Sequence, residues 1–273
     1  MNIEGVRKIL SNSFGESTYS VYVPSMNQSF SFKPLSVGQR KSISKISLEY
    51  ENIIEYQYLK LAIISETCLE KISIEELTDI DFVSIVASIR KNNIVEPLKL
   101  SVPCDNTDCK EKFSLLVDFD VILDRCKNYK FKTIEFEKTI SDTQFKVVLS
   151  DPSIIDYLGY QNYIDVIRKD KELSEMMPPN KTKVLLYPIQ FIKDIYINNE
   201  LINDFKDLSF VDRIKFLDEF PSSFIYGDDN SVLSKVIENF ESSRLNALFE
   251  DIVCPKCKAI QEGVLAFDNF FII

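Results

Sequence analysis

Residues 252–263 read IVCPKCKAIQEG, a short stretch in which two residues separate Cys254 from Cys257. A tight turn that carries two cysteines at this spacing directs both thiolates toward one point, provided that strands on either side hold the turn in place. The residues on both sides of the pair are typical of such strands. The stretch therefore predicts a zinc-binding knuckle.

A second cysteine pair lies far upstream, in VPCDNTDCKEKF at residues 102–113, where four residues separate the two cysteines. The extended run VEPLKLSVPC leads into this pair and KFSLLVDFDVIL follows it, so the segment again predicts strand, turn and strand. Two such pairs supply the four thiolates of a closed tetrahedral zinc site. We therefore predict one structural Zn²⁺ ion bound by four residues: Cys104, Cys109, Cys254 and Cys257.

Two other uses of these cysteines stay open at this point. The wider loop of the first pair also fits reduced thiols left over from an ancestral metal site, and close pairs can form disulfides or do redox work. Six cysteines without a secretion signal favour a reducing compartment, where close pairs hold metal more often than they form disulfides. Cys68 and Cys126 stand alone, and we expect them to be core or surface thiols.

The 273-residue chain contains no histidine, which weighs against the most familiar hydrolytic sites. Serine and cysteine hydrolases of the usual kind rely on an imidazole base, and catalytic zinc commonly has histidine ligands. Four thiolates around one ion would also leave no coordination position for a substrate. We therefore expect that the protein is not an enzyme.

The net charge of −10 opposes the phosphate backbone of nucleic acids, and no block of lysine and arginine offsets it. No apolar run approaches the roughly 18–20 residues that span a bilayer. The start of the chain also lacks the long apolar core of a signal peptide. These features predict an intracellular protein that binds neither nucleic acid nor membrane.

The first half of the chain combines a hairpin with helices. Residues 1–19 are polar and weakly patterned, so we expect an N-terminal arm. The alternation in YSVYVPSMNQSFSF predicts a β-hairpin that turns near residues 25–28, and the SVGQ that begins at Ser36 predicts a helix start with a capping box. A second helix should begin near Thr78, and its apolar residues predict one buried face: Phe82, Ile85, Val86 and Ile89.

The second half follows a similar plan. TQFKVVLSDPS predicts a strand that ends in a Ser/Pro turn, and SIIDYLGYQNYIDVIRK predicts the helix after it. In DIYINNELI, Asn198 and Asn199 predict a type I′ hairpin turn, since asparagine accepts positive φ. Ser209 and Asp212 predict the capping box of a further helix.

These patterns together predict an α+β protein of two similar halves, each running strand, helices, knuckle and strand. The first half covers residues 20–140 and contains the first cysteine pair. The second covers residues 141–273, contains the second pair and includes an inserted hairpin at about residues 180–205. A split four-cysteine site, similar to a zinc ribbon, would join the two halves.

The order of several segments resembles the baseplate hub proteins of T-even-like bacteriophages. The matching segments are the strand-to-helix entry FSFKPLSVGQRKSI, the helix LTDIDFVSIVASIRKNN with Asp81 and Arg90, the first knuckle, and FEDIVCPKCK followed by FDNFF. The resemblance covers an order of elements over roughly residues 20–273, while residues 170–210 contain no matching segment. None of the matching segments is a catalytic signature.

This resemblance implies a structural or assembly role in a contractile tail baseplate, at the hub or at the junction of hub and wedges. It implies protein–protein binding within a larger assembly, with other baseplate hub and wedge proteins as partners. It also implies a place in the virion, after assembly in the host cytoplasm. The many Phe and Tyr residues suit such interfaces.

Two other classes of function stay open from the sequence. One is a cellular zinc-ribbon adaptor subunit of a multiprotein complex, which a basic groove or an exposed aromatic stacking platform would favour. The other is an enzyme that works through two carboxylates, such as a glycosidase. No spacing of acidic residues in this chain points to such a pair.

Overall fold

The computed structural model describes residues 4, 17–49, 53–94, 96–202, 205–227, 229–240 and 252–261. The chain forms two compact units: Met1–Tyr129 with Arg244–Ile273, and Lys130–Ser243. Helices and antiparallel strands occur in both units, which confirms the α+β class. The first division falls after Tyr129, whereas the expected boundary between the halves was at 140/141, and the segment with the C-terminal knuckle is grouped with the first unit. The similarity of two halves stays a prediction, and most of the expected N-terminal arm lies outside the described residues.

The first unit begins with the predicted hairpin. Strands β1 (Tyr19–Val23) and β2 (Gln28–Phe32) pair antiparallel, with the short helix η1 (Pro24–Met26) between them. Asn27, at φ 48°, closes the turn, so the predicted turn near residues 25–28 is confirmed. Alternate residues on one face of the hairpin are buried: Val21, Val23, Phe30 and Phe32.

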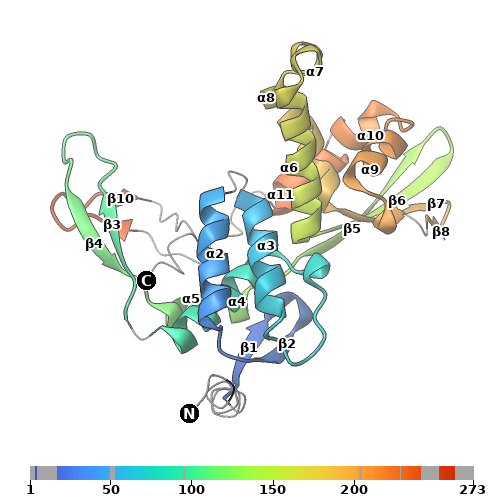
Figure 1. Cartoon of the computed structure of the whole chain (residues 1–273). Coiled ribbons are helices and arrows are strands. Elements are labelled where there is room, and N and C mark those ends of the chain that lie inside the picture. The colour runs from blue at the N-terminus through green and yellow to red at the C-terminus, as the bar shows by residue number, and fades with distance from the viewer. Residues whose placement is uncertain are drawn as a thin grey trace. The chain divides into compact units, whose positions relative to one another are not determined.

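Two helices follow the hairpin, α2 (Val37–Glu49) and α3 (Ile53–Ser65), and they lie side by side (Figure 1). The predicted capping box at the start of α2 is confirmed. The Gln39 backbone N–H donates to Ser36 Oγ at 3.2 Å, and the Ser36 N–H donates to Gln39 Oε1 at 3.0 Å. A short helix η2 (Ile74–Glu76) then leads to the next long helix.

Helix α4 (Asp79–Asn93) is the centre of the first unit, and all of its residues from 79 to 90 are buried. The expectation of one buried face was therefore too narrow. Two of the buried polar residues bond to the hairpin: Ser84 Oγ donates to the Tyr22 carbonyl at 2.6 Å, and Asp81 accepts the Ser25 N–H at 2.8 Å. Thr78 and Asp81 form the capping box that begins the helix.

The strand after the first cysteine pair is shorter than the sequence predicted. Strand β4 ends at Leu116, and the apolar residues beyond it form helix α5 (Phe119–Asn128). The reason is local, because the Asp118 side chain accepts the backbone N–H groups of Asp120 and Val121 and caps the new helix. Helix α5 packs against α4, which explains why its apolar side chains leave the strand pattern.

The second unit is built on a four-stranded antiparallel sheet in the order β5-β6-β7-β8. Its strands are Thr133–Ile140, Thr143–Ser150, Ile192–Ile197 and Glu200–Leu201. The predicted turn between the last two strands is confirmed, since Asn198 and Asn199 have φ values of 50° and 69°. Strand β5 was not anticipated. Ser141 and Asp142 join it to β6 through a turn that also has positive φ at both positions.

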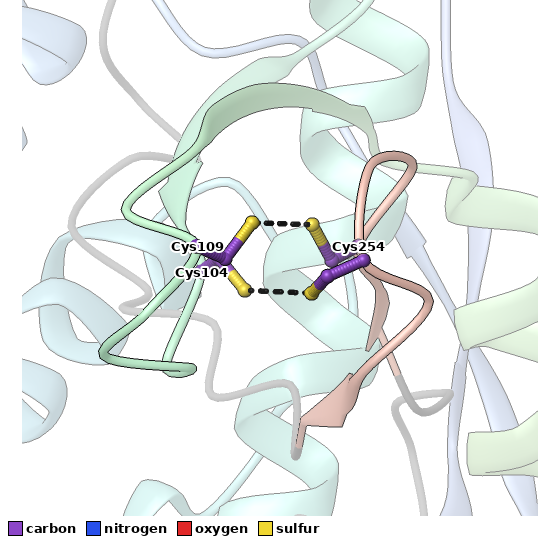
Figure 2. Close-up of side chains that lie close together, drawn as sticks. Cys104, Cys109 and Cys254 are labelled. Carbon is purple, nitrogen blue, oxygen red and sulfur yellow. Dashed lines mark hydrogen bonds between the residues drawn. The ribbon is translucent and has the colours of Figure 1, made fainter.

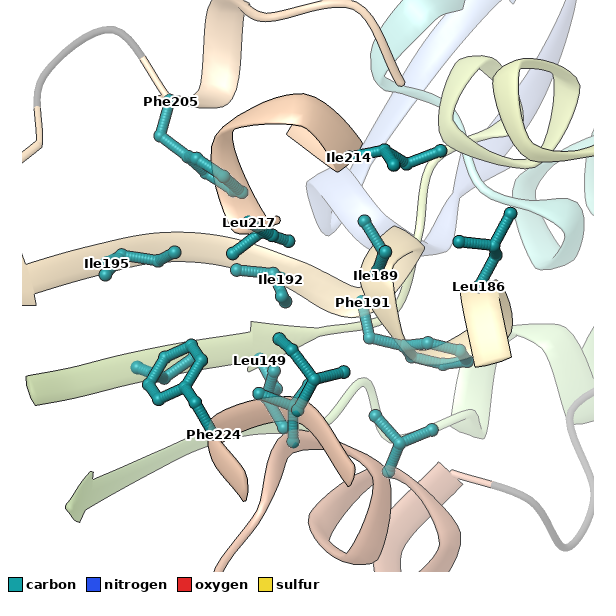
Figure 3. Close-up of a cluster of buried hydrophobic side chains, with 14 of the residues drawn as sticks. Leu149, Leu186, Ile189, Phe191, Ile192, Ile195, Phe205, Ile214, Leu217 and Phe224 are labelled. Atoms are coloured by element: carbon teal, nitrogen blue, oxygen red, sulfur yellow. The ribbon is translucent and has the colours of Figure 1, made fainter. Parts of the chain in front are cut away.

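The second unit also contains helices, several of which pack against the sheet. They are α6 (Ile154–Lys169), α7 (Lys171–Met176), α8 (Pro179–Leu186), α9 (Phe210–Leu217), α10 (Ser222–Tyr226) and α11 (Val232–Phe240), with short helices η3 (Tyr187–Phe191) and η4 (Phe205–Asp207). Helix α7 contacts α6. Figure 3 shows the resulting core. The side chains of Ile192 and Ile195 extend from β7 into this core, together with side chains of the helices. The hairpin expected as an insertion at about 180–205 thus contributes β7 to the middle of the fold.

Ser209 caps α9 as predicted, since its Oγ accepts the Asp212 N–H, but the reciprocal bond of the expected capping box is not among the described bonds. Ser153 and Asp156 form a capping box at the start of α6 that was not predicted from the sequence.

Among the described residues, no helix combines the length and the apolar character that crossing a bilayer requires.

Gly159 of α6 gives a test of how closely α6 and α9 approach. A Cβ at this position would stand 2.7 Å from the Cβ of Phe210, too close for either backbone to remain where it is. We expect Gly159→Ala to lower the free energy of unfolding by about 1–3 kcal/mol through overpacking, despite the higher helix propensity of alanine. Thermal unfolding followed by circular dichroism measures the change.

The matched control is Gly38→Ala near the start of α2, where the nearest heavy atom to an added Cβ is Ser36 Oγ at 3.8 Å. This variant should keep or raise the melting temperature, because alanine favours the helix and meets no obstacle. Equal stabilisation by both substitutions would contradict the close approach of α6 and α9.

Candidate metal centre

Two short hairpins carry the four predicted cysteine ligands, and both belong to the first unit. Strands β3 (Lys99–Pro103) and β4 (Lys112–Leu116) flank the first pair. Strands β9 (Ile252–Val253) and β10 (Ile260–Gln261) flank the second. The predicted plan of strand, turn and strand is therefore present at both pairs.

The two turns share their backbone hydrogen bonding although their lengths differ. The Cys104 N–H donates to the Glu111 carbonyl at 2.8 Å, and the Cys254 N–H donates to the Ala259 carbonyl at 3.0 Å. In each case the first cysteine bonds to the residue two positions after the second cysteine. This bond closes the turn and places both sulfurs on its inner side.

Each turn also contains a left-handed residue directly after its second cysteine. These residues are Lys110, at φ 50°, and Lys258, at φ 61°. Positive φ is uncommon for lysine, and its occurrence at the same point of both turns indicates a common local geometry. The four-residue spacing of the first pair thus produces a knuckle equivalent to the two-residue spacing of the second.

The four sulfurs converge between the two hairpins (Figure 2). Cys104 Sγ lies 3.6 Å from Cys257 Sγ, and Cys109 Sγ lies 3.8 Å from Cys254 Sγ. All four sulfurs lie within 4.8 Å of one another. Four thiolates bound at ~2.3 Å in a tetrahedron would stand ~3.8 Å apart. A disulfide would require a separation of ~2.05 Å, and all four cysteines are free.

Backbone amides aid ionisation of the most buried sulfur, Cys254, which has no exposed surface. The Cys257 backbone N–H donates to this sulfur and lowers the pKa of the Cys254 thiol to about 7, against the opposing effect of burial. The Lys256 backbone N–H acts in the same direction. This turn therefore favours a thiolate at its first ligand.

In the first turn, the pKa of the first cysteine is raised when no metal ion is bound. The Asn106 backbone N–H favours the Cys104 thiolate, but burial and the adjacent thiols of Cys257 and Cys254 raise the pKa of Cys104 to about 12. Four thiols at this spacing cannot all lose their protons without a cation between them. A metal ion would supply that charge and release the protons.

Two further contacts connect the hairpins outside the sulfur cluster. Gln261, which is buried, donates through Nε2 to the Pro103 carbonyl at 2.9 Å and accepts the Asp105 N–H at 3.0 Å. These two backbone groups flank Cys104, so the glutamine amide orients the first ligand. At the surface, Lys256 Nζ lies 3.1 Å from Glu111 Oε2.

Sequence reasoning did not identify Gln261 as part of the site. Its only signal was a glutamine next to Ile260 in a short strand, which is common in solvent-facing hairpins. The two single cysteines are as expected: Cys126 is fully buried in α5, Cys68 is partly exposed, and neither belongs to the cluster.

Comparison with known proteins identifies no family for this chain. No protein-family model, no curated protein and no solved structure matches it. The interpretation of the four-cysteine cluster therefore depends on its own geometry.

The cluster predicts that the purified protein contains about one metal ion per chain, measurable by elemental analysis. Cys254→Ser and Cys257→Ser should lose most of this metal. They should also melt roughly 10 °C lower, because the ion contributes several kcal/mol and each 1 kcal/mol shifts the melting temperature of a chain of this size by about 2–4 °C. Cys68→Ser, outside the cluster, should retain both metal and stability. Metal-free protein with unaltered melting in the cluster variants would rule out this interpretation.

Gln261→Ala tests whether the amide positions the first knuckle. Loss of both hydrogen bonds should leave the four ligands in place but weaken metal binding by about 10–100-fold, as is typical when partners of metal ligands are removed. Competition with a chromophoric chelator measures the affinity. Gln28→Ala, at an exposed position of β2, is the control and should bind metal like the original protein. An unchanged affinity in Gln261→Ala would show that the sulfurs alone set the site.

Proposed function

We propose that this protein is a structural or assembly component of a contractile phage tail baseplate, at the hub or at the junction of hub and wedges. The observation that carries the proposal is the order of segments over residues 20–273 that resembles baseplate hub proteins. The protein would act by binding neighbouring hub and wedge proteins within the virion. Its chemistry would be structural, without a catalytic step.

The proposed occupant of the cysteine cluster is a structural Zn²⁺ ion. Thiolate ligands favour soft or borderline metals, and a tetrahedral site of four sulfurs is typical of zinc or of iron–sulfur chemistry. Two knuckles that contribute two thiolates each are the usual arrangement for zinc. Since four thiolates complete the coordination sphere, the ion would stabilise the fold and would not bind a substrate.

The hairpins themselves suggest why a metal would be needed. Strands β9 and β10 contain two residues each, and such a short hairpin is not stable in water without further support. Zinc binding contributes on the order of 10 kcal/mol to the folding of small isolated modules. The ion would fix residues 252–261 against the first hairpin and so hold together the zinc ribbon that we propose from the two knuckles.

This arrangement suits a building block of an assembly. The chain leaves the first knuckle, forms the second unit, and returns to supply the second knuckle. A metal ion shared by both knuckles would therefore close a long loop and limit the conformational freedom of the chain between them. Next to the cluster, Val253 and Ile260 are cross-strand partners and are 51% and 68% exposed, which provides an apolar surface for a neighbour.

Co-expression with hub and wedge proteins of a contractile tail tests the proposal. We expect the protein to co-elute with at least one of them in size-exclusion chromatography. Cys254→Ser should reduce the recovered complex, because the second knuckle would lose its support, and Cys68→Ser should not. A protein that stays monomeric and unbound beside every hub and wedge candidate would refute the baseplate role. Recovery in a cellular multiprotein complex instead would favour the zinc-ribbon adaptor.

A further inference from the structure

The second unit contains a partly enclosed cavity of about 160 Å³ that is unrelated to the cysteine cluster. Its inner wall is aliphatic and comes from α8 and η3 on one side of the β7–β8 hairpin in sequence and from α9 and α10 on the other. Every side chain of this wall is less than 9% exposed: Leu186, Ile189, Ile214, Leu217 and Ile225. Figure 3 shows the first four of these side chains within the larger core cluster.

The path of the chain explains why this space exists. Helix α9 ends at Leu217, and Pro221 begins the five-residue helix α10 after a tight turn in which the Phe220 N–H donates to the Leu217 carbonyl. Ile214 and Leu217 lie one helical turn apart, so both point to the same side of α9. The turn brings Ile225 to that side as well, and a hollow remains between these side chains.

The rim of the cavity combines the partly buried ring of Phe220 with polar and acidic groups. Asp218 and Ser222 are exposed there, and Tyr226 is half-buried. Within the part of the chain that the structure describes, the Asp218 carboxylate has no ion-pair partner. Burial, and then the charge of Asp218, raise the pKa of Tyr226, which indicates that the carboxylate and the phenol are close. Glu219, next in sequence and also exposed, adds a second negative charge.

Size and charge together define what this cavity would accept. A cavity of ~150 Å³ with an apolar lining is large enough for a benzene-sized group. The Asp218 carboxylate, which forms no ion pair among the described residues, favours a cation beside that group, and the net charge of −10 favours basic partner surfaces in general. A single apolar side chain next to a lysine or arginine has both properties.

We propose that this cavity binds a phenylalanine or leucine side chain of a partner protein, with an adjacent lysine or arginine of that partner paired to Asp218. That the ligand is part of a protein rests on the proposed function, in which this protein binds neighbouring proteins. The cavity itself can be tested without any baseplate protein, so the two proposals can fail separately.

The probe is benzylammonium, which combines a benzene ring with a cation, and benzyl alcohol is its neutral counterpart. In protein labelled at the methyl groups of Ile and Leu, both probes should shift the NMR signals of Ile189, Ile214 and Ile225 in a saturable manner. Benzylammonium should bind about two- to fivefold more tightly, the range expected for one ion pair near the surface.

Three variants give the controls. Asp218→Asn should bring the affinity for benzylammonium down to that for benzyl alcohol, while Glu200→Gln, an exposed acid on β8, should keep the difference. Ile225→Phe should fill the cavity and weaken both probes at least about tenfold. Methyl signals of the second unit's core away from the cavity, such as those of Leu149 and Ile164, show whether this unit is folded in the variant, and Leu217→Phe serves as a second filled variant.

Two results would overturn the proposal. One is a set of shifts that does not saturate or that spreads over the surface, which would mean that the cavity does not accept a benzene-sized group. The other is an unchanged preference for benzylammonium in Asp218→Asn, which would remove the cation from the proposed ligand. Binding of the probes in a protein that forms no baseplate complex would leave the cavity proposal intact and refute only the partner assignment.

Discussion

Four cysteine sulfurs that lie within 4.8 Å of one another create a strong electrostatic constraint on the first unit. Thiolates at such distances repel each other, and protonated thiols give only weak hydrogen bonds, so neither state holds two hairpins firmly together. A divalent cation at the centre would attract all four thiolates and offset their mutual repulsion. In the proposed metal-bound state, this attraction would hold residues 252–261 against the first hairpin.

The surrounding structure is consistent with this role of the cluster. Both turns use the same backbone bond and the same left-handed residue, so each presents its sulfurs with little freedom. Gln261 forms one hydrogen bond with the residue before Cys104 and one with the residue after it. These two bonds connect the second hairpin to the first. Outside the sulfurs, the described polar contacts between the hairpins are the two bonds of Gln261 and the surface pair of Lys256 with Glu111.

Interactions between residues close in sequence explain the successful predictions. The Ser36–Gln39 capping box and the Asn198–Asn199 turn each depend on neighbouring residues, and both are present as expected. The helix start expected near Thr78 is also present, and Asp81 completes its cap. The knuckles belong to the same group. The errors occurred where two local patterns competed, as after Leu116, where the Asp118 cap prevailed over continuation of the strand. Strand β5 was not predicted, because its several charged residues did not suggest a strand that pairs with β6.

The sequence by itself determined the helix caps, the positive-φ turns, the two knuckles and the α+β class, since each follows from sterics and hydrogen bonds within a few residues. Only the tertiary structure decided which elements meet. It placed the C-terminal knuckle with the first unit, buried α4 on all sides, brought Gln261 to Cys104 and left a cavity beside α9. These features depend on contacts between residues far apart in the chain, and their free energy arises from burial and pairing that no local pattern encodes.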